Sequence, residues 1–270
     1  MTQPLALDGK VVVVTGATGS MGKSFIDGIA EAGGAVGILG RNRKVAEDRA
    51  TQINLNGGKA IALCADVTNR HDLANARRVM LDTYGKIDGL VNAAGGTALA
   101  KRGESDDIFE GRIEEVKKAM ELNLWGTVLP TLVFGDAIAR YGEGSIVNIS
   151  SMAARRVVDK SMGYTVAKAA IEAFTRWFAV ELGRRFKDAI RMNSIAPGCF
   201  LTERNHDHLT NPDGTYTKMA SDIIGLTPVG RLGEPDDLKG ALVWLLSDQS
   251  KFVTGTTITV DGGFMANGGI

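Results

Sequence analysis

The chain has 270 residues, of which 44% are hydrophobic and 23% charged, and Lys plus Arg equal Asp plus Glu at 31 each. This composition is typical of a folded globular protein, and the zero net charge excludes the basic field that gathers nucleic acid or anionic lipid. The sequence therefore predicts small-molecule partners, with no nucleic acid and no membrane.

Short apolar segments alternate with amphipathic segments along most of the chain. The apolar segments predict strands, and they read KVVVVTG, AVGILG, KAIALCADV, IDGLVNAAG, GSIVNISS, AIRMNSIAPG and TTITVDGG. Helical patterns fill the intervals at about 19–32, 43–56, 70–83, 113–140, 164–186 and 235–247. The polar stretches 96–111 and 200–233 carry neither pattern and predict irregular loops.

Strands that are apolar on both faces and alternate with helices predict a parallel sheet covered on both sides. With right-handed crossovers, this is a Rossmann-type, doubly wound α/β fold of about seven strands. The sequence contains no internal repeat or linker, so we expect a single domain over residues 1–270. Ligands of such sheets bind at the carboxyl ends of the strands, which places substrate loops near 96–111 and 200–233.

Cysteine and histidine are too sparse to predict a disulfide framework or a metal site. Cys64 and Cys199 do not form a Cys-x-x-Cys motif and cannot complete a four-ligand zinc site. His71, His206 and His208 lie in polar stretches that favour solvated side chains, so we predict no metal. The first residues, MTQPLALDGK, lack the pattern of a secretory signal, and a cytoplasmic protein is expected.

A glycine-rich turn, TGATGSMG, follows the first strand and opens the first helix. Glycines at Gly16, Gly19 and Gly22 allow backbone N–H groups to approach a pyrophosphate, whose charge the helix amino end stabilises. Their spacing is not G-x-G-x-x-G, and a tight turn alone would also explain them.

Four further motifs follow this turn in an order that resembles the short-chain dehydrogenase/reductase family. They are NAAG from Asn92 to Gly95, the serines Ser150 and Ser151, YTVAK from Tyr164 to Lys168, and the pair Pro197–Gly198. The resemblance covers essentially the whole chain and implies a nicotinamide-dependent enzyme that interconverts a secondary alcohol and a ketone. The turn departs from the family's T-G-x-x-x-G-x-G at Ser20, whose hydroxyl can itself donate to a phosphate.

Tyr164 and Lys168 are four residues apart, a spacing that places them on one face of a helix. A free phenol has a pKa of ~10, and bringing it to ~7 takes roughly 4 kcal/mol, which a nearby ammonium and a positive nicotinamide can supply. The resemblance implies that Tyr164 handles the proton and that Lys168 also binds the nicotinamide ribose. It further implies that Ser151 donates to the carbonyl oxygen and that Asn123 holds a proton-relay water.

The resemblance also assigns the contacts to the cofactor. They are Gly16, Thr18, Gly19, Ser20, Met21, Gly22, Arg41, Asn42, Asp66, Val67, Asn92, Ala93, Gly95, Tyr164, Lys168, Pro197, Gly198 and Thr202. Where members that use NAD usually carry an acid, this chain has Gly40 followed by Arg41. An arginine fork can pair with a 2′-phosphate, which favours NADP(H) over NAD(H). The choice stays open because subfamilies with a GRN stretch are not all specific for NADP.

The C-terminal half resembles the D-mannonate (D-fructuronate) oxidoreductase-type branch in SIVNISSMAA, APGCFLTERN, LTNPDGTYT and TPVGRLGEP. That branch reduces the ketone of a sugar acid, whose carboxylate needs a cation. The implied substrate residues are Ser151, Lys160, Tyr164, Arg204 and Asn205, with Arg155 and Arg156 as further candidates. The stretch 96–111 departs from the branch, so a gluconate or polyol dehydrogenase and a 3-ketoacyl reductase remain alternatives.

Two expectations concern assembly and the possibility of a protein without turnover. The helices at 113–140 and 164–186 resemble the family's four-helix dimer interface and imply a homodimer or homotetramer. A nucleotide-sensing binding module is the alternative from a different class. Such a sensor would have no use for the complete set of proton-handling residues.

Overall fold

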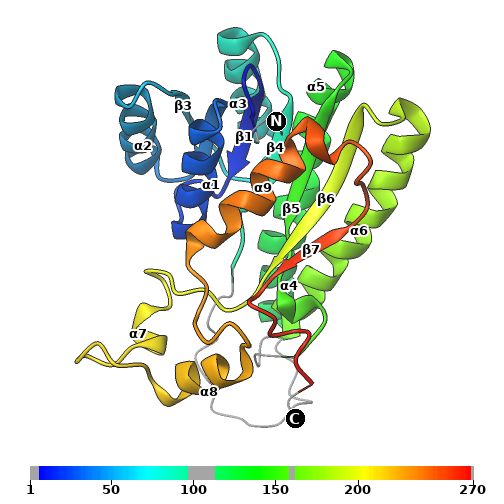
Figure 1. The fold of residues 1–270 in the computed structure, drawn as a ribbon. Helices are drawn as coiled ribbons and strands as arrows, with labels where there is room; N and C mark the ends of the chain where they lie inside the picture. The colour runs from blue at the N-terminus through cyan, green and yellow to red at the C-terminus, as the bar shows by residue number, and fades with distance from the viewer. Residues whose placement is uncertain (1–5, 97–112, 158–161, 269–270) are drawn as a thin grey trace, which may run out of the picture.

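A parallel sheet of seven strands forms the centre of the computed structural model, which describes residues 6–96, 113–157 and 162–268 (Figure 1). The strands run in the order β3-β2-β1-β4-β5-β6-β7. Their bounds are β1 (Val11–Thr15), β2 (Ala35–Gly40), β3 (Lys59–Cys64), β4 (Gly89–Asn92), β5 (Gly144–Ile149), β6 (Ile190–Pro197) and β7 (Thr257–Val260). The order reverses between β1 and β4, which opens a crevice at their carboxyl ends. The predicted doubly wound, single-domain fold is confirmed.

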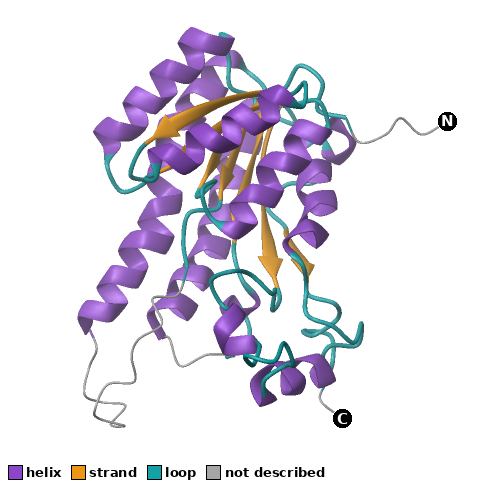
Figure 2. Ribbon diagram, turned by 90° about the vertical axis from the view of Figure 1, so that its left-hand side faces the viewer, coloured by secondary structure: helices purple, strands orange, loops and turns teal. Residues whose placement is uncertain are grey.

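Helices cover both faces of this sheet (Figure 2). Their bounds are α1 (Ser20–Glu31), α2 (Arg43–Leu55), α3 (Arg70–Tyr84), α4 (Ile113–Met120), α5 (Gly126–Tyr141), α6 (Met162–Phe186), α7 (His206–Leu209), α8 (Lys218–Leu226) and α9 (Lys239–Leu246). Phe25 and Leu242 belong to the core under α1, α2 and α9, and Met80 and Phe134 to the core under α3, α5 and α6. Burial on both faces explains why the strands are apolar throughout.

The structure corrects two of the predicted segments. The helix expected over 113–140 is interrupted by a π-helical turn, Glu121–Trp125, between α4 and α5. The stretch 200–233, expected to be irregular, contains α7 and α8. These helices have four and nine residues, which is too short for a clear helical period in the sequence. Several strands end earlier than expected, and β3 stops at Cys64.

One stretch among the described residues, Ile113–Tyr141, is long and apolar enough to cross a membrane by length and composition alone. Half of its apolar window is buried inside the fold, and it packs against β4, β5 and α6. Core helices of globular proteins commonly have the same length and composition, and the packing of this stretch is that of a core element.

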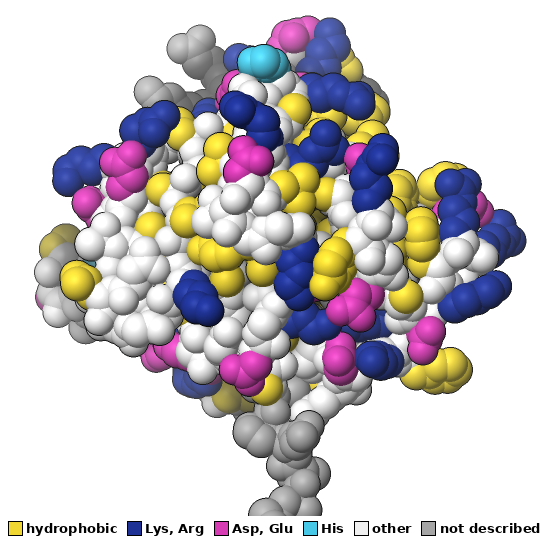
Figure 3. Space-filling view, turned by 90° about the horizontal axis from the view of Figure 1, so that it is seen from above, with side chains coloured by type: hydrophobic (Ala, Val, Ile, Leu, Met, Phe, Trp, Pro, Cys, Tyr) yellow, Lys and Arg dark blue, Asp and Glu magenta, His cyan; other side chains and the backbone are white. Residues whose placement is uncertain are grey.

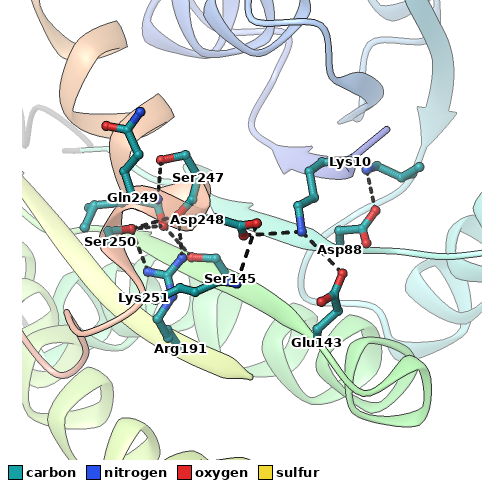
Figure 4. Close-up of polar contacts among 12 residues, drawn as sticks. Lys10, Asp88, Glu143, Ser145, Arg191, Ser247, Asp248, Gln249, Ser250 and Lys251 are labelled. Carbon is teal, nitrogen blue, oxygen red and sulfur yellow. Dashed lines mark hydrogen bonds and ion pairs between the residues drawn. The ribbon is translucent and has the colours of Figure 1, made fainter. Parts of the chain in front are cut away.

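Charged and hydroxyl side chains hold together the amino ends of the strands (Figure 4). The buried Asp88 accepts a hydrogen bond of 2.7 Å from the backbone N–H of Val11. Lys10 Nζ lies 3.3 Å from Glu143 Oε1, and the guanidinium of Arg191 donates to Ser250 Oγ at 2.8 Å. From above, this face intersperses cations with carboxylates (Figure 3). These contacts join the amino ends of the strands to one another and to the segment after α9, at the edge of the sheet opposite the crevice.

Candidate active site

The buried side chain of Lys168 lies at the centre of the candidate site, at the carboxyl edge of the sheet. Its Nζ donates a hydrogen bond of 2.7 Å to the carbonyl oxygen of Ile149, the last residue of β5, and lies 5.5 Å from the centroid of the Tyr164 ring. Burial lowers the pKa of Lys168 to about 8, because a charged ammonium is poorly solvated there. Tyr164 and Lys168 both lie on α6, and the contact between their side chains confirms the predicted placement on one face of a helix.

Asn123 lies within the π-helical turn and is completely buried. Its Oδ1 accepts from the backbone N–H of Gly96 at 3.0 Å, and its Nδ2 donates to the carbonyl oxygens of Gly96 at 3.1 Å and Ala119 at 3.0 Å. These bonds, with one of 2.9 Å from Thr127 Oγ1 to the Asn123 carbonyl, explain where the predicted long helix is interrupted. Such π-turns are frequent at functional sites.

Gly95 shows how closely these groups approach one another. A Cβ atom added to Gly95 would lie 2.6 Å from Asn123 Oδ1 and 3.5 Å from Lys168 Nζ. The chain after β4, the π-turn and α6 therefore converge on one point. Only glycine fits there without displacing the amide of Asn123.

The two serines after β5 point in different directions. Ser151 precedes a short 3₁₀ turn, and its Oγ accepts from the backbone N–H of Ala153 at 3.1 Å. This bond uses a lone pair and leaves the hydroxyl proton to be donated elsewhere. Ser150 is buried and donates to Glu172 Oε1 at 3.1 Å, on the side of α6.

The glycine-rich turn after β1 packs closely against the segment that follows β4. Gly16 has a φ of +65°, and a Cβ atom there would lie 2.7 Å from the carbonyl oxygen of Ala93. Helix α1 starts after Gly19 with no capping side chain, whereas Asn42 and Asn69 cap α2 and α3. The first N–H groups of α1 are thus left for a ligand, so this turn fits a dinucleotide.

Arg49 is also part of this region, although no motif or spacing predicted it. From α2 its Nη1 donates to the carbonyl oxygens of Ala17 and, at 2.8 Å, Gly19. Burial lowers the pKa of Arg49. The charged group therefore holds the turn in place from the side of α2.

The residues predicted for the adenosine end lie after β2 and β3. Asn42 Oδ1 accepts from Val45 N at 3.2 Å, so its side chain caps α2. Asp66 Oδ1 accepts from the N–H and the hydroxyl of Thr68, and these bonds, with the charge of Arg41, lower the pKa of Asp66. Arg41 itself is exposed and has no carboxylate within ion-pair distance in the described part of the chain.

Asn92 and Gly198, both predicted to bind the cofactor, also make contacts that hold the strands together. The Asn92 side chain points into the core, where its Nδ2 donates to Thr131 Oγ1 at 2.9 Å and Asn148 Oδ1 at 2.8 Å. A Cβ atom on Gly198 would lie 2.7 Å from Asp261 Cα, so glycine lets β6 close against the segment after β7.

The loop after β6 brings one predicted cation to the site. A Cβ atom on Gly96 would lie 3.1 Å from Arg204 Cζ, so the guanidinium lies against the residue that Asn123 holds. Asn205, also predicted to bind substrate, makes hydrogen bonds within this loop. Its Oδ1 accepts from the N–H of Thr202 at 2.7 Å and its Nδ2 donates to the Phe200 carbonyl at 2.8 Å.

Two further predicted cations, Arg155 and Arg156, contact other parts of the fold. Arg155 Nε donates to the buried carboxylate of Glu172 at 3.0 Å. Arg156 lies over the Phe264 ring at 4.8 Å. Both are thus engaged in the fold, and Lys160 lies outside the described residues. Among the residues described, no group of three or more His, Cys, Asp and Glu is arranged to hold a metal ion.

Comparisons with known proteins agree with this geometry. A family model described as "Enoyl-(Acyl carrier protein) reductase" (adh_short_C2) matches residues 16–265. The chain is 38% identical to the "Uncharacterized oxidoreductase UxuB" of Bacillus subtilis (strain 168), over 98% of this chain and 98% of that protein.

Two solved structures are also similar over nearly their whole length. One is a putative D-mannonate oxidoreductase from Haemophilus influenza with bound NAD, at 33% identity and a TM-score of 0.88, covering 98% of each chain. The other is a gluconate 5-dehydrogenase from Burkholderia cenocepacia J2315 in complex with NADP and tartrate, at 28% identity and a TM-score of 0.86, covering 97% of each chain. The chain thus belongs to the short-chain dehydrogenase/reductase family of nicotinamide-dependent oxidoreductases, which act on alcohol and ketone groups.

Proposed function

We propose that this protein interconverts a secondary alcohol and a ketone on a sugar acid such as D-mannonate or D-fructuronate, with NADP(H) preferred over NAD(H). The observation that carries the proposal is the position of the Arg204 guanidinium against Gly96, next to Asn123. A guanidinium there can bind a substrate carboxylate while the reacting carbon lies near Tyr164. The two structural relatives, a putative D-mannonate oxidoreductase and a gluconate 5-dehydrogenase, support the same substrate class.

Tyr164, Lys168 and Ser151 divide the proton chemistry among them. The bound nicotinamide supplies or accepts the hydride, and the turn at Gly16 together with the uncapped start of α1 would hold its dinucleotide. Tyr164 gives a proton to the substrate oxygen in reduction and removes it in oxidation. The Lys168 ammonium, near the Tyr164 ring, favours the phenolate and so lowers the free energy of that transfer. Ser151 donates its hydroxyl proton to the substrate oxygen.

Arg41 supports the proposed preference for NADP(H). It directly follows Gly40, the last residue of β2, which has no carboxylate of its own to repel a 2′-phosphate. Nearby Arg43 and Lys44 instead pair with Glu47 and Asp48 along α2. Arg41 is therefore the cation of this segment best placed to bind a phosphate. Titrating the protein with NADPH and NADH tests the preference, and tighter binding of NADH would contradict it.

The alternatives differ in the ligand that they require. A polyol dehydrogenase needs no cation for its substrate, whereas a 3-ketoacyl reductase would need a basic surface suited to a carrier protein. A sensor without turnover would not need the hydroxyl of Tyr164. Absorbance of the reduced nicotinamide, followed with aldonates, ketouronates and sugar alcohols, separates these cases.

Replacing Tyr164 by Phe is expected to abolish turnover and to change the Kd of the cofactor little, because the ring remains and the proton is lost. The measurement is kcat together with cofactor binding by fluorescence. Tyr141→Phe, at the distant end of α5, is the matched control and should keep full activity. If Tyr164→Phe retained more than about a tenth of kcat, about 1.4 kcal/mol in the barrier, the assignment of Tyr164 would be wrong.

Replacing Arg204 by Gln is expected to raise KM for a sugar acid about tenfold or more, because a charge-assisted hydrogen bond is lost. With a neutral polyol that the enzyme also accepts, KM should hardly change. Lys218→Gln, an exposed cation of the same loop region, serves as the control. Equal effects on charged and neutral substrates would show that Arg204 supports the loop and does not bind the carboxylate.

Burial of Lys168 predicts a particular dependence of stability on pH. Its pKa is about 8 in the folded chain and 10.5 as the ordinary value, so between these pH values the unfolded chain binds a proton that the folded chain lacks. The contribution of Lys168 to the free energy of unfolding therefore increases as pH rises through 8, by about 1 kcal/mol between pH 7 and 9.

Urea unfolding of the wild type and of Lys168→Met, both without cofactor, measures this gain. The difference in stability between them should shift in favour of the wild type as pH rises from 7 to 9. Lys118→Met, at an exposed lysine, should show no such shift. Parallel pH profiles for the wild type and Lys168→Met would contradict a lowered pKa.

Helices α4 to α6 support the proposal of a homodimer or homotetramer. Large apolar side chains are exposed along them, namely Trp125, Leu132, Val166, Trp177 and Val180. Two copies that pack these helices together would bury this surface, which is unusually apolar for one exposed to water. Sedimentation velocity is expected to show a dimer or tetramer at working concentrations, and a monomer would refute the proposal.

A further inference from the structure

We propose that Thr18 is a specificity-determining residue, because its side chain closes position 40 to any residue larger than glycine. A Cβ atom added to Gly40 would lie 2.6 Å from both Cγ2 and Oγ1 of Thr18 and 3.1 Å from its Cβ. The φ of Gly40 lies outside the left-handed region, so the backbone does not itself require glycine there. The requirement comes from the space that Thr18 occupies.

Rotation of the Thr18 side chain cannot remove this obstruction. Staggered rotamers give Cβ three positions for its substituents, and at Thr18 the two positions that face Gly40 both hold a heavy atom. A threonine places two heavy atoms in three positions, so at least one always faces Gly40. Serine has a single γ atom, which can turn to the third position. At position 18, threonine therefore obstructs position 40 in every rotamer, whereas serine has a rotamer that does not.

The backbone of the turn cannot retreat either. The N–H of Ala17 donates to the carbonyl oxygen of Leu39, which precedes Gly40, at 3.1 Å. Arg49 donates to the carbonyl oxygens of Ala17 and Gly19, the residues on each side of Thr18. Thr18 is thus fixed against β2 from both sides.

The effect of Thr18 on cofactor preference rests on the proposed function, in which the end of β2 binds the adenosine ribose of the cofactor. A carboxylate at position 40 would accept hydrogen bonds from both ribose hydroxyls and repel a 2′-phosphate. With Thr18 in place such a carboxylate does not fit, and recognition is left to Arg41. Thr18 therefore prevents a single change at Gly40 from converting the preference from NADP(H) to NAD(H).

A double-mutant series tests the steric claim without any cofactor. Gly40→Ala is combined with Thr18, Thr18→Val and Thr18→Ser, and Tm is measured for each apo protein. Valine keeps both γ atoms, so Gly40→Ala should lower Tm by about 3–6 °C with threonine or valine at position 18. With serine the loss should be at most about 1 °C. Equal losses in the three backgrounds would overturn the proposal.

The same backgrounds test the effect on specificity. Gly40→Asp with Thr18 should bind NADH no better than the wild type, whereas Gly40→Asp with Thr18→Ser should gain about tenfold for NADH and lose about tenfold for NADPH. Gly40→Asp with Thr18→Val should behave like Gly40→Asp alone. Equal NADH affinity of the three Gly40→Asp proteins would overturn the role of Thr18 in specificity.

Arg41→Asp separates this inference from the proposed cofactor preference. If it leaves the ratio of NADPH to NADH affinity unchanged, Arg41 does not read the phosphate and the preference loses its support. The Tm series would still decide whether Thr18 excludes larger residues from position 40. Arg43→Asp, the same change of charge two residues along, controls for general electrostatic effects.

Discussion

The geometry of the candidate site depends on a row of buried polar side chains that crosses the sheet at its carboxyl edge. In the strand register Thr15 pairs with Asn92, Asn92 with Asn148, and Asn148 with Ser194. All four are at most 1% exposed. A buried polar group that loses its partner costs about 1–3 kcal/mol, so a shift of any of these strands is strongly disfavoured. The row therefore fixes the relative positions of the strands where function requires it.

This row also attaches the π-turn and helix α6, which carry the proposed proton-handling residues Asn123 and Lys168. The side-chain amide of Asn92 on β4 donates to the hydroxyl of Thr131 on α5. The Thr131 hydroxyl donates to the carbonyl oxygen of Thr127, whose own hydroxyl donates to the carbonyl oxygen of Asn123 in the π-turn. The side-chain amide of Asn148 on β5 donates to the hydroxyl of Thr175 on α6, seven residues after Lys168. Asn123 and Lys168 are thus held by neighbouring strands and not by loops. Sites built on regular elements keep their distances better than sites built on loops.

The sequence predicted those parts of the molecule that depend on local pattern. Alternation of apolar and amphipathic segments gave the layers, because strands buried on both faces have no polar side, and the spacing of Tyr164 and Lys168 gave their common face. The π-turn was missed because it depends on bonds between Asn123 and Gly96, 27 residues apart in sequence. Arg49 was missed for the same reason, since its partners lie in another element. Periodicity carries no information about such partners.

The two ends of the site are held by different kinds of constraint. At the cofactor end, backbone contacts and the packing of Thr18 on Gly40 leave little room for any side chain to change. At the proposed substrate end, Arg204 is on an exposed loop whose shape comes from hydrogen bonds within the loop, made by Asn205. Loop residues of this kind can change without disturbing the sheet. This difference is consistent with relatives of the same fold that are named for different substrates, since the proposed proton-handling residues are anchored to the sheet and the proposed substrate contact is on a loop.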